Sequence, residues 1–303
     1  MRTSKWMTAA VAIAAAVTGG LAVSAPAQAA ANPCVMEVDS ITAGGNLTGT
    51  RITASTPPTA SDPGAGTHLF TAGIAKASTS WFSMLGTGSG VTYTGSVILN
   101  DTLYNASFGY EDSTGDPFQK LTRVGSGWGT FTAVEESIYQ PYVGSPDVRS
   151  TLYGLRGDGT LLRWTPGPNN TWRAAGSATG FGSYKALALI SQTGTYDTFL
   201  ATTKSGGLVT IRLPLASPLK PVVKQLRSSG WGSYDSLVAE KCGTQSTLLT
   251  AIDKETGKAD LYAVGHANGT ATAISPLGQL PGKHVDAINV RGASDTAEHL
   301  FGE

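Results

Sequence analysis

Aromatic side chains set between glycines recur in three loops of this sequence. The loops read Gly127-Trp128-Gly129-Thr130-Phe131, Gly180-Phe181-Gly182-Ser183-Tyr184 and Gly230-Trp231-Gly232-Ser233-Tyr234. An accessible aromatic ring stacks on the apolar face of a hexose, while neighbouring amide and hydroxyl groups bind the hydroxyls of the sugar. The residue types and their spacing therefore indicate carbohydrate binding as the chemistry available to these loops.

The candidate carbohydrate-binding residues lie in these loops or directly after them. They are Trp128, Phe131, Phe181, Tyr184, Trp231, Tyr234 and Asp235. A second interpretation fits the same pattern, because a Trp-Gly pair that recurs in an array of repeats also packs as a wedge between neighbouring units. The two roles are compatible, and the sequence leaves both open.

The loops are spaced at a nearly constant interval. Trp128 and Phe181 are 53 residues apart, and Phe181 and Trp231 are 50 residues apart. A fixed period of this size is typical of a fold built from one repeated unit. Beyond the N-terminal segment, short β-prone runs alternate with Gly, Asp, Asn and Ser, which is the pattern of all-β sandwiches and propellers.

The clearest repeat covers residues 184–230 and predicts a unit of four strands. We expect these strands at 186–190, 198–202, 208–213 and 222–226. Lys204-Ser205-Gly206-Gly207 between the second and third strands supplies the positive φ that a tight hairpin requires. The neighbouring units have the same order, with second and third strands at 151–155 and 161–164, and at 247–251 and 259–264.

Segments near both ends of the chain extend the pattern. Residues 68–72 and 102–106 occupy the second-strand position of two further units. Residues 284–290 restart the unit after Pro281-Gly282-Lys283, which replaces Gly-Trp-Gly, and 298–301 give its second strand. Segments 35–41 and 45–52 supply the two strands that are then missing. We therefore predict an all-β fold, a β-propeller of about six (alternatively five) four-stranded blades, closed by both termini sharing one blade.

The N-terminal segment is typical of a secretory signal peptide. Arg2 and Lys5 precede the apolar residues 7–23, and Ala27-Gln28-Ala29 supplies a small-x-small cleavage pattern. We predict a signal peptide at 1–29 and a single propeller domain at 30–303. A membrane anchor is the alternative, but Gly19-Gly20 interrupts the segment and no stop-transfer charges follow. We expect a secreted, extracellular protein without membrane insertion in its mature form.

The two cysteines, Cys34 and Cys242, are predicted to form a disulfide. A single pair in an oxidising compartment usually pairs, and two residues are too few for a metal site. The bond would close a loop of roughly 200 residues, which is worth ~4–5 kcal/mol on the chain-entropy description. On the propeller interpretation it joins neighbouring blades.

The charge balance excludes some partners. Without Arg2 and Lys5, 19 basic residues face 21 acidic ones. Nucleic acids and anionic membrane surfaces attract basic fields, so neither is an expected partner. The low content of charged residues, 14%, together with 38 glycines, is typical of a secreted β protein rich in turns.

One stretch resembles a known family. Residues 151–166, Thr-Leu-Tyr-Gly-Leu-Arg-Gly-Asp-Gly-Thr-Leu-Leu-Arg-Trp-Thr-Pro, followed by Thr171-Trp172 and the loop at 180–184, are similar to the strand-turn-strand of tachylectin-like β-propellers. The resemblance covers residues 121–274 and implies a lectin that binds N-acetylated hexosamines at several equivalent sites between blades. The sequence departs from the family in its longer period, in Phe181 for Trp, and in Gly282 where a Trp is expected.

Residues that would indicate catalysis or metal binding are sparse. The four histidines are scattered, and neither HExxH nor G-x-S-x-G occurs. Glu111-Asp112 and Glu135-Glu136 are the adjacent acidic pairs that a propeller glycoside hydrolase could use. The loops at 111–116 and 253–257 have the composition of calcium sites but lack regular ligand spacing, so we expect hairpin turns. We predict a non-catalytic, monomeric glycan-binding protein with no cofactor or metal. A protein-interaction propeller and a propeller hydrolase are the alternatives.

Overall fold

The computed structural model describes residues 33–85, 90–111, 113–142, 144–293 and 299–303. The regular secondary structure of these residues is β-strand, apart from one 3-10 turn at Pro168–Asn170. Within these ranges, no helix has both the length and the apolar character needed to cross a membrane. The predicted signal peptide at 1–29 lies outside the described residues.

Three successive four-stranded sheets are antiparallel meanders. Their strands are β10 (Phe131–Tyr139), β11 (Arg149–Arg156), β12 (Leu161–Pro166), β13 (Trp172–Ala178), β14 (Tyr184–Gln192), β15 (Tyr196–Thr203), β16 (Leu208–Pro214), β17 (Val222–Arg227), β18 (Ser236–Cys242), β19 (Ser246–Asp253), β20 (Lys258–Val264) and β21 (Ile274–Gln279). The four strands predicted between residues 186 and 226 lie within β14 to β17. The all-β fold and its four-stranded unit are therefore confirmed.

The remaining strands form a ten-stranded sheet that has two parts. One part has the order β22-β1-β2-β3 and the other the order β6-β7-β8-β9, while β4 pairs with β2 and β5 with β7. The bounds are β1 (Val35–Ile41), β2 (Asn46–Thr53), β3 (Thr59–Ala60), β4 (Thr67–His68), β5 (Ala75–Ser78), β6 (Trp81–Leu85), β7 (Val91–Leu99), β8 (Thr102–Tyr110), β9 (Pro117–Ser126) and β22 (Ile288–Ala293). A short parallel pairing of β22 with β6 joins the parts. Because β1 pairs with β22, segments near both ends of the chain share a sheet.

The strand predicted at 68–72 is wrong. The pairing with β2 ends at His68, and residues 69–72 form no strand. Leu69 and Phe70 are instead buried, with both backbone N–H groups donating to the carbonyl of Gly45 at 3.1 and 3.0 Å. Two adjacent apolar residues that pack into the core from a loop cannot be told from a short buried strand by their local sequence.

Two further strand predictions need correction. Residues 102–106 belong to β8, which is the third strand of its sheet and not the second, because β6 and β7 precede it. Residues 299–301 form no strand, and Phe301 makes a single bridge with Ser191. Leu300 is not part of a strand, and its side chain belongs to the buried cluster that contains Tyr153 and Phe199. Glu298 lies outside the described residues.

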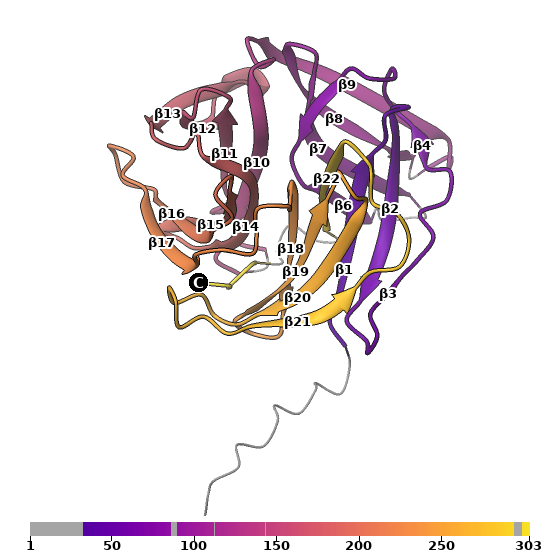
Figure 1. Ribbon diagram of the computed structural model, residues 1–303. Coiled ribbons are helices and arrows are strands. Elements are labelled where there is room, and N and C mark those ends of the chain that lie inside the picture. The colour runs from indigo at the N-terminus through magenta and orange to yellow at the C-terminus, as the bar shows by residue number, and fades with distance from the viewer. Residues whose placement is uncertain (1–32, 86–89, 112, 143, 294–298) are drawn as a thin grey trace, which may run out of the picture. The chain divides into compact units, whose positions relative to one another are not determined.

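Hydrophobic clusters lie between neighbouring sheets. Phe199 and Leu155 belong to a cluster shared by β10–β13 and β14–β17, and Leu200 and Leu249 to one shared by β14–β17 and β18–β21. Similar clusters join β18–β21 to β1–β2, β1–β2 to β6–β9, and β6–β9 to β10–β13. The first strands β10, β14 and β18 are neighbours, and Figure 1 shows them, with β22, on the inner side of their sheets.

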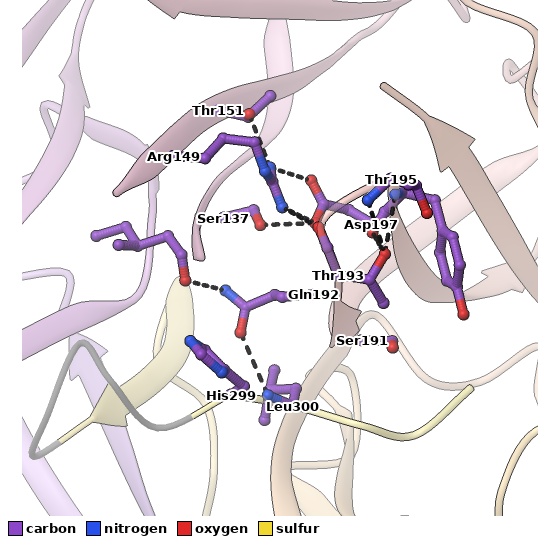
Figure 2. A network of polar contacts seen from close by, with 12 residues as sticks. Ser137, Arg149, Thr151, Ser191, Gln192, Thr193, Thr195, Asp197, His299 and Leu300 are labelled. Carbon is purple, nitrogen blue, oxygen red and sulfur yellow. Dashed lines mark hydrogen bonds and ion pairs between the residues drawn. The ribbon is translucent and has the colours of Figure 1, made fainter. Parts of the chain in front are cut away.

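A buried ion pair links two of these sheets. Asp197 in β15 is fully buried, and its carboxylate accepts two hydrogen bonds from the Arg149 guanidinium of β11, at 2.7 and 2.8 Å. The hydroxyls of Tyr153 and Ser137 donate to the same carboxylate at 2.8 and 2.9 Å. Figure 2 shows Ser137 and Arg149 reaching Asp197 across the boundary between the sheets. Four donors from β10 and β11 thus compensate one buried charge of β15.

Candidate functional site

The three glycine-aromatic loops have one common geometry. Gly127, Gly180 and Gly230 hold φ values of +93°, +96° and +91°, which other residues rarely adopt. The N–H of the following aromatic residue then donates to a carbonyl in the hairpin between the second and third strands of the preceding sheet. The distances are 3.0 Å for Trp128, 2.9 Å for Phe181 and 2.9 Å for Trp231. Each loop therefore fixes the step from one sheet to the next.

The last copy of the loop, Pro281-Gly282-Lys283, aligns with the other three differently from the sequence-based alignment, which placed Gly282 at the Trp position. Gly282 has φ +91°, so it takes the place of the first glycine and not that of the Trp. The N–H that reaches the preceding hairpin, at the carbonyl of Gly257, belongs to His284 at 2.9 Å. One extra residue, Lys283, separates the two positions.

The loop aromatic rings are buried between sheets. Trp128 is 8% exposed, and Phe181 and Trp231 are each 6% exposed. The Trp128 ring lies 4.8 Å from both Phe131 and Trp164, and the Trp231 ring lies 4.8 Å from Tyr262, measured between ring centroids. Protein atoms therefore cover the surfaces that a sugar would stack on, which favours packing as the role of these rings.

The other predicted residues are engaged in contacts with neighbouring protein groups. Phe131 and Tyr234 are buried, and Tyr184 is half-buried beside Phe181. The Tyr234 hydroxyl donates to Asp260 at 2.9 Å. Asp235 forms an ion pair with Lys185 at 2.8 Å. The seven predicted residues belong to three separate loops, and the structure does not bring them together into one site.

Exchanging one aromatic residue for another tests the packing role. Trp231→Phe places at this loop the residue type that Phe181 provides in the neighbouring loop. We expect a loss of about 1–2 kcal/mol in the free energy of unfolding, because a large-to-small change leaves a partial cavity, against about 3–5 kcal/mol for Trp→Ala. Denaturant unfolding measures it. An unchanged unfolding midpoint would contradict the packing role.

A cleft opens where the face of one sheet changes from large apolar to small and polar residues. Ile41, Leu47 and Ile288 of β1, β2 and β22 pack into the core shared with β6–β9. Asp39 and Gly49 lie on the same face, two residues from Ile41 and Leu47, and Gly292 lies there four residues from Ile288. A Cβ at Gly292 would lie 2.7 Å from the Asp39 carboxylate, and one at Gly49 3.2 Å away. The absence of side chains at these two glycines therefore leaves space beside the carboxylate.

This Asp39 cleft consists of two neighbouring hollows that share Asp39, Gly49 and Tyr93. The aromatic half, about 480 Å³, is walled by Tyr93, Phe108 and Tyr110 from β7 and β8. The Tyr93 and Phe108 rings stack at 4.9 Å with 11° between their planes. Aromatic walls of this kind offer apolar faces next to polar edges.

The polar half of the cleft, about 650 Å³, contains charged groups. Glu37 and Arg51, which line it with Asp39, form an ion pair at 2.9 Å. Trp81 lies at its base, 1% exposed, and among the described residues its indole N–H has no acceptor, which is uncommon for a buried donor. The polar half is thus lined by an ion pair and by a Trp whose buried indole N–H has no acceptor among the described residues.

Burial sets the electrostatics of the cleft. It raises the pKa of Asp39 to about 7, and the nearby negative charge of Glu37 adds to this shift. The pKa of Tyr93 is raised as well, by burial first and then by the charges of Asp39 and Glu37. Clefts that contain titratable groups with shifted pKa values are candidates for functional sites.

A second hollow lies on the other face of the β6–β9 sheet. Because alternate residues of a strand point to opposite faces, Thr94, Asn105 and Lys120 turn away from the Asp39 cleft. With Trp172 of β13 and Glu136 of β10 they line a space of about 310 Å³. A face between two packed sheets is usually apolar, so this hydroxyl- and amide-rich wall is a secondary candidate site.

The adjacent acids Glu135 and Glu136 do not form a catalytic pair. The Glu135 carboxylate accepts hydrogen bonds from the N–H and hydroxyl of Ser80, both at 3.0 Å, whereas Glu136 accepts one from Ser150 on another strand. Burial raises the pKa of Glu135 to about 7 and raises that of Glu136. Adjacent residues of a strand point to opposite faces of the sheet, so these two carboxyl groups do not flank one glycosidic bond as the acid and the carboxylate of a hydrolase would.

The loops with calcium-like composition are hairpins where the structure describes them. Residues 253–257 connect β19 to β20, and the Asp253 carboxylate accepts the N–H of Thr256 at 3.0 Å. That backbone N–H lowers the pKa of Asp253. In the loop at 111–116, Asp112 lies outside the described residues. Across the described ranges, no group of three or more His, Cys, Asp or Glu residues gathers as metal ligands do.

Comparison with known proteins gives similarity in fold outline only. No family model and no curated protein matches the sequence. Among solved structures, the SapL1 lectin in complex with alpha-methyl fucoside matches with a TM-score of 0.45 and 11% identity over 82% of this chain and 81% of that one. AofleA from Arthrobotrys oligospora matches with a TM-score of 0.46 and 12% identity over 86% and 73%. The catalytic domain of a GH62 alpha-L-arabinofuranosidase from Coprinopsis cinerea gives 0.41 and 12% over 73% and 74%. At these scores the similarities carry no conclusion about ligand or activity.

Sequence reasoning missed the residues of the Asp39 cleft. Asp39, Gly49, Tyr93 and Gly292 come from four strands separated by up to 253 positions. Their local patterns are those of ordinary half-buried strands. The one available signal was the aromatic alternation Phe108-Gly109-Tyr110 at the end of β8, where the rings share one face of the strand.

Proposed function

We propose that this is a secreted, monomeric, non-catalytic protein that binds hexosamine-containing glycans in the Asp39 cleft. The observation that carries the proposal is an open cleft with aromatic walls, Tyr93 and Tyr110 among them, and an accessible carboxyl group, Asp39. A pyranose ring needs both kinds of surface, because its C–H face is apolar and its rim carries hydroxyls. The disulfide between Cys34 and Cys242 supports an oxidising, extracellular location.

We also propose a β-propeller of five blades as the framework of this site. Support comes from the neighbouring first strands β5, β10, β14, β18 and β22, and from clusters that join each sheet to the next. The six-blade interpretation required a further sheet at residues 68–72, where no strand continues. On this proposal β22 and β1–β3 form the blade that both termini share.

The second hollow beside Trp172 and the glycine-aromatic loops are further proposed contact regions. Weak sites on one molecule would strengthen attachment to a glycan-coated surface by multivalency. Direct ligand contact by Trp128, Phe181 or Trp231 stays a prediction. The burial of these rings favours the alternative in which the loops only pack the sheets and glycan is bound elsewhere.

Truncating an exposed wall residue tests the proposed site. Tyr110 is 54% exposed, so Tyr110→Ala removes a stacking surface with little effect on the core. We expect about two- to tenfold weaker binding of N-acetylglucosamine oligomers, since the loss of one aromatic contact is worth about 0.5–1.5 kcal/mol. Isothermal titration calorimetry with chitin tetramers measures the affinity.

The chain offers a matched control for this measurement. Tyr142 is 65% exposed and lies between β10 and β11, away from the cleft. Tyr142→Ala should bind glycan as the unchanged protein does. Equal weakening in both variants would point to a general effect of surface aromatics, and no binding of acetylated or free-amine hexosamine oligomers by the unchanged protein at millimolar sugar would refute the proposed function.

A further inference from the structure

The aromatic half of the Asp39 cleft contains a single charge. Of the described residues that line it, Asp39 alone carries a formal charge, and the others are aromatic, apolar, hydroxyl-bearing or amide side chains and glycines. In the neighbouring polar half, Arg51 is already paired with Glu37 at 2.9 Å. A ligand in the aromatic half therefore meets one carboxylate with no opposing charge on the same wall.

The Asp39 carboxyl also lacks a hydrogen-bond donor. No described side chain or backbone N–H donates to its oxygens, whereas the carboxylates of Asp197 and Asp101 each receive at least two such bonds. An unpaired, half-buried charge is unfavourable unless a ligand compensates it. Gly49 and Gly292 leave the space beside it in which such a ligand group fits.

The rings around this carboxyl suit a cation. Tyr93 and Phe108 present a stacked pair, and Tyr110 extends the wall. The face of an aromatic ring carries partial negative charge and attracts an ammonium group, and aromatic cages recognise organic cations in this way. A neutral ligand would gain from the rings but would leave the carboxylate unpaired.

We propose that the Asp39 cleft selects hexosamines whose amine is free, and therefore cationic, over hexosamines whose amine is acetylated. The inference rests on the proposed glycan-binding function and specifies its ligand class. The ammonium group donates hydrogen bonds to the Asp39 carboxylate and lies against Tyr93, while the pyranose ring extends along Tyr110. An acetamide carries no charge, so it forms neither the ion pair nor the cation–π contact.

This selectivity has a pH dependence that the burial of Asp39 sets first and the charge of Glu37 second. Glu37 and Arg51 face Asp39 from its own sheet, Tyr93 and Tyr110 from the opposite wall, and Glu240 and Lys241 line the polar half. With its pKa raised to about 7, Asp39 is mostly protonated at pH 5.5 and mostly ionised at pH 8. Affinity for a permanent cation should therefore rise with pH through this range.

The experiment compares three tetrasaccharides on the full-length mature chain by calorimetry. They are the tetramers of glucosamine, of N-acetylglucosamine, and of trimethylated glucosamine, whose charge does not titrate. At pH 7 and low salt we expect the free-amine tetramer to bind at least about tenfold tighter than the acetylated one, as one paired charge is worth roughly 1.4 kcal/mol or more. The trimethylated tetramer should bind about tenfold tighter at pH 8 than at pH 5.5.

Asp39→Asn keeps the side-chain shape and removes the charge, so it should bring the ratio of the two affinities to about one. Glu255→Gln, an exposed change in the β19–β20 hairpin, should keep the tenfold ratio. Equal affinities in the unchanged protein, or a preference that survives Asp39→Asn, would overturn the inference while leaving the proposed function intact. Failure of all three tetramers to bind would refute the proposed function itself.

Discussion

Loss of the disulfide is expected to lower the free energy of unfolding by about 4–5 kcal/mol. Cys34 precedes β1 and Cys242 ends β18, with a Cα–Cα distance of 5.5 Å across 208 positions of sequence. The bond therefore removes the large chain entropy of a long open loop from the unfolded state. It confirms the pairing predicted from the two cysteines and joins the β18–β21 sheet to the sheet that contains β1 and β22.

The measurement is guanidinium unfolding of the double variant Cys34→Ser/Cys242→Ser beside the unchanged protein. Met36, Val38 and Val238 pack in the cluster next to the bond, so the variant should still fold, at a lower midpoint. A reducing agent should lower the midpoint of the unchanged protein to that of the variant and leave the variant where it is. A variant within about 1 kcal/mol of the unchanged protein would contradict the entropic role.

The inner strands were predictable from sequence because burial and turn chemistry act locally. In the 184–230 unit, apolar runs bounded by Gly206-Gly207 and by the loop before Val222 predicted all four strands to within two residues at each end. The outermost strand β21 was not predicted. Its residues Ile274–Gln279 are half-buried or exposed, so they show no apolar alternation.

Tertiary context decided the remainder. The sequence around Leu69 and Phe70 is typical of a strand. Their N–H groups instead both donate to the carbonyl of Gly45, which places them in a loop. The loop aromatics illustrate a second limit. The residue type alone leaves open whether the Trp231 ring contacts a sugar or packs in the core. In the structure, the Tyr262 ring lies against the Trp231 ring, so this surface is already occupied.

Removal of the Arg149 guanidinium is expected to destabilise the protein by about 3–5 kcal/mol, because a buried charge that loses its partner is left uncompensated. Asp197 has no exposed surface, and in Arg149→Ala it would keep only the hydroxyls of Tyr153 and Ser137. These neutral donors do not balance a carboxylate in a low-dielectric interior. Thermal and denaturant unfolding should both show the loss.

Arg156→Ala is the matched control for this prediction. Arg156 pairs with Asp158 in the β11–β12 hairpin, where both side chains are largely solvated, so its removal should change the unfolding midpoint little. The contrast isolates burial as the cause, since both variants delete an arginine bonded to an aspartate. If Arg149→Ala unfolded at the same denaturant concentration as Arg156→Ala, the link between β11 and β15 would not depend on charge, and the apolar cluster around Phe199 would alone hold these two sheets together.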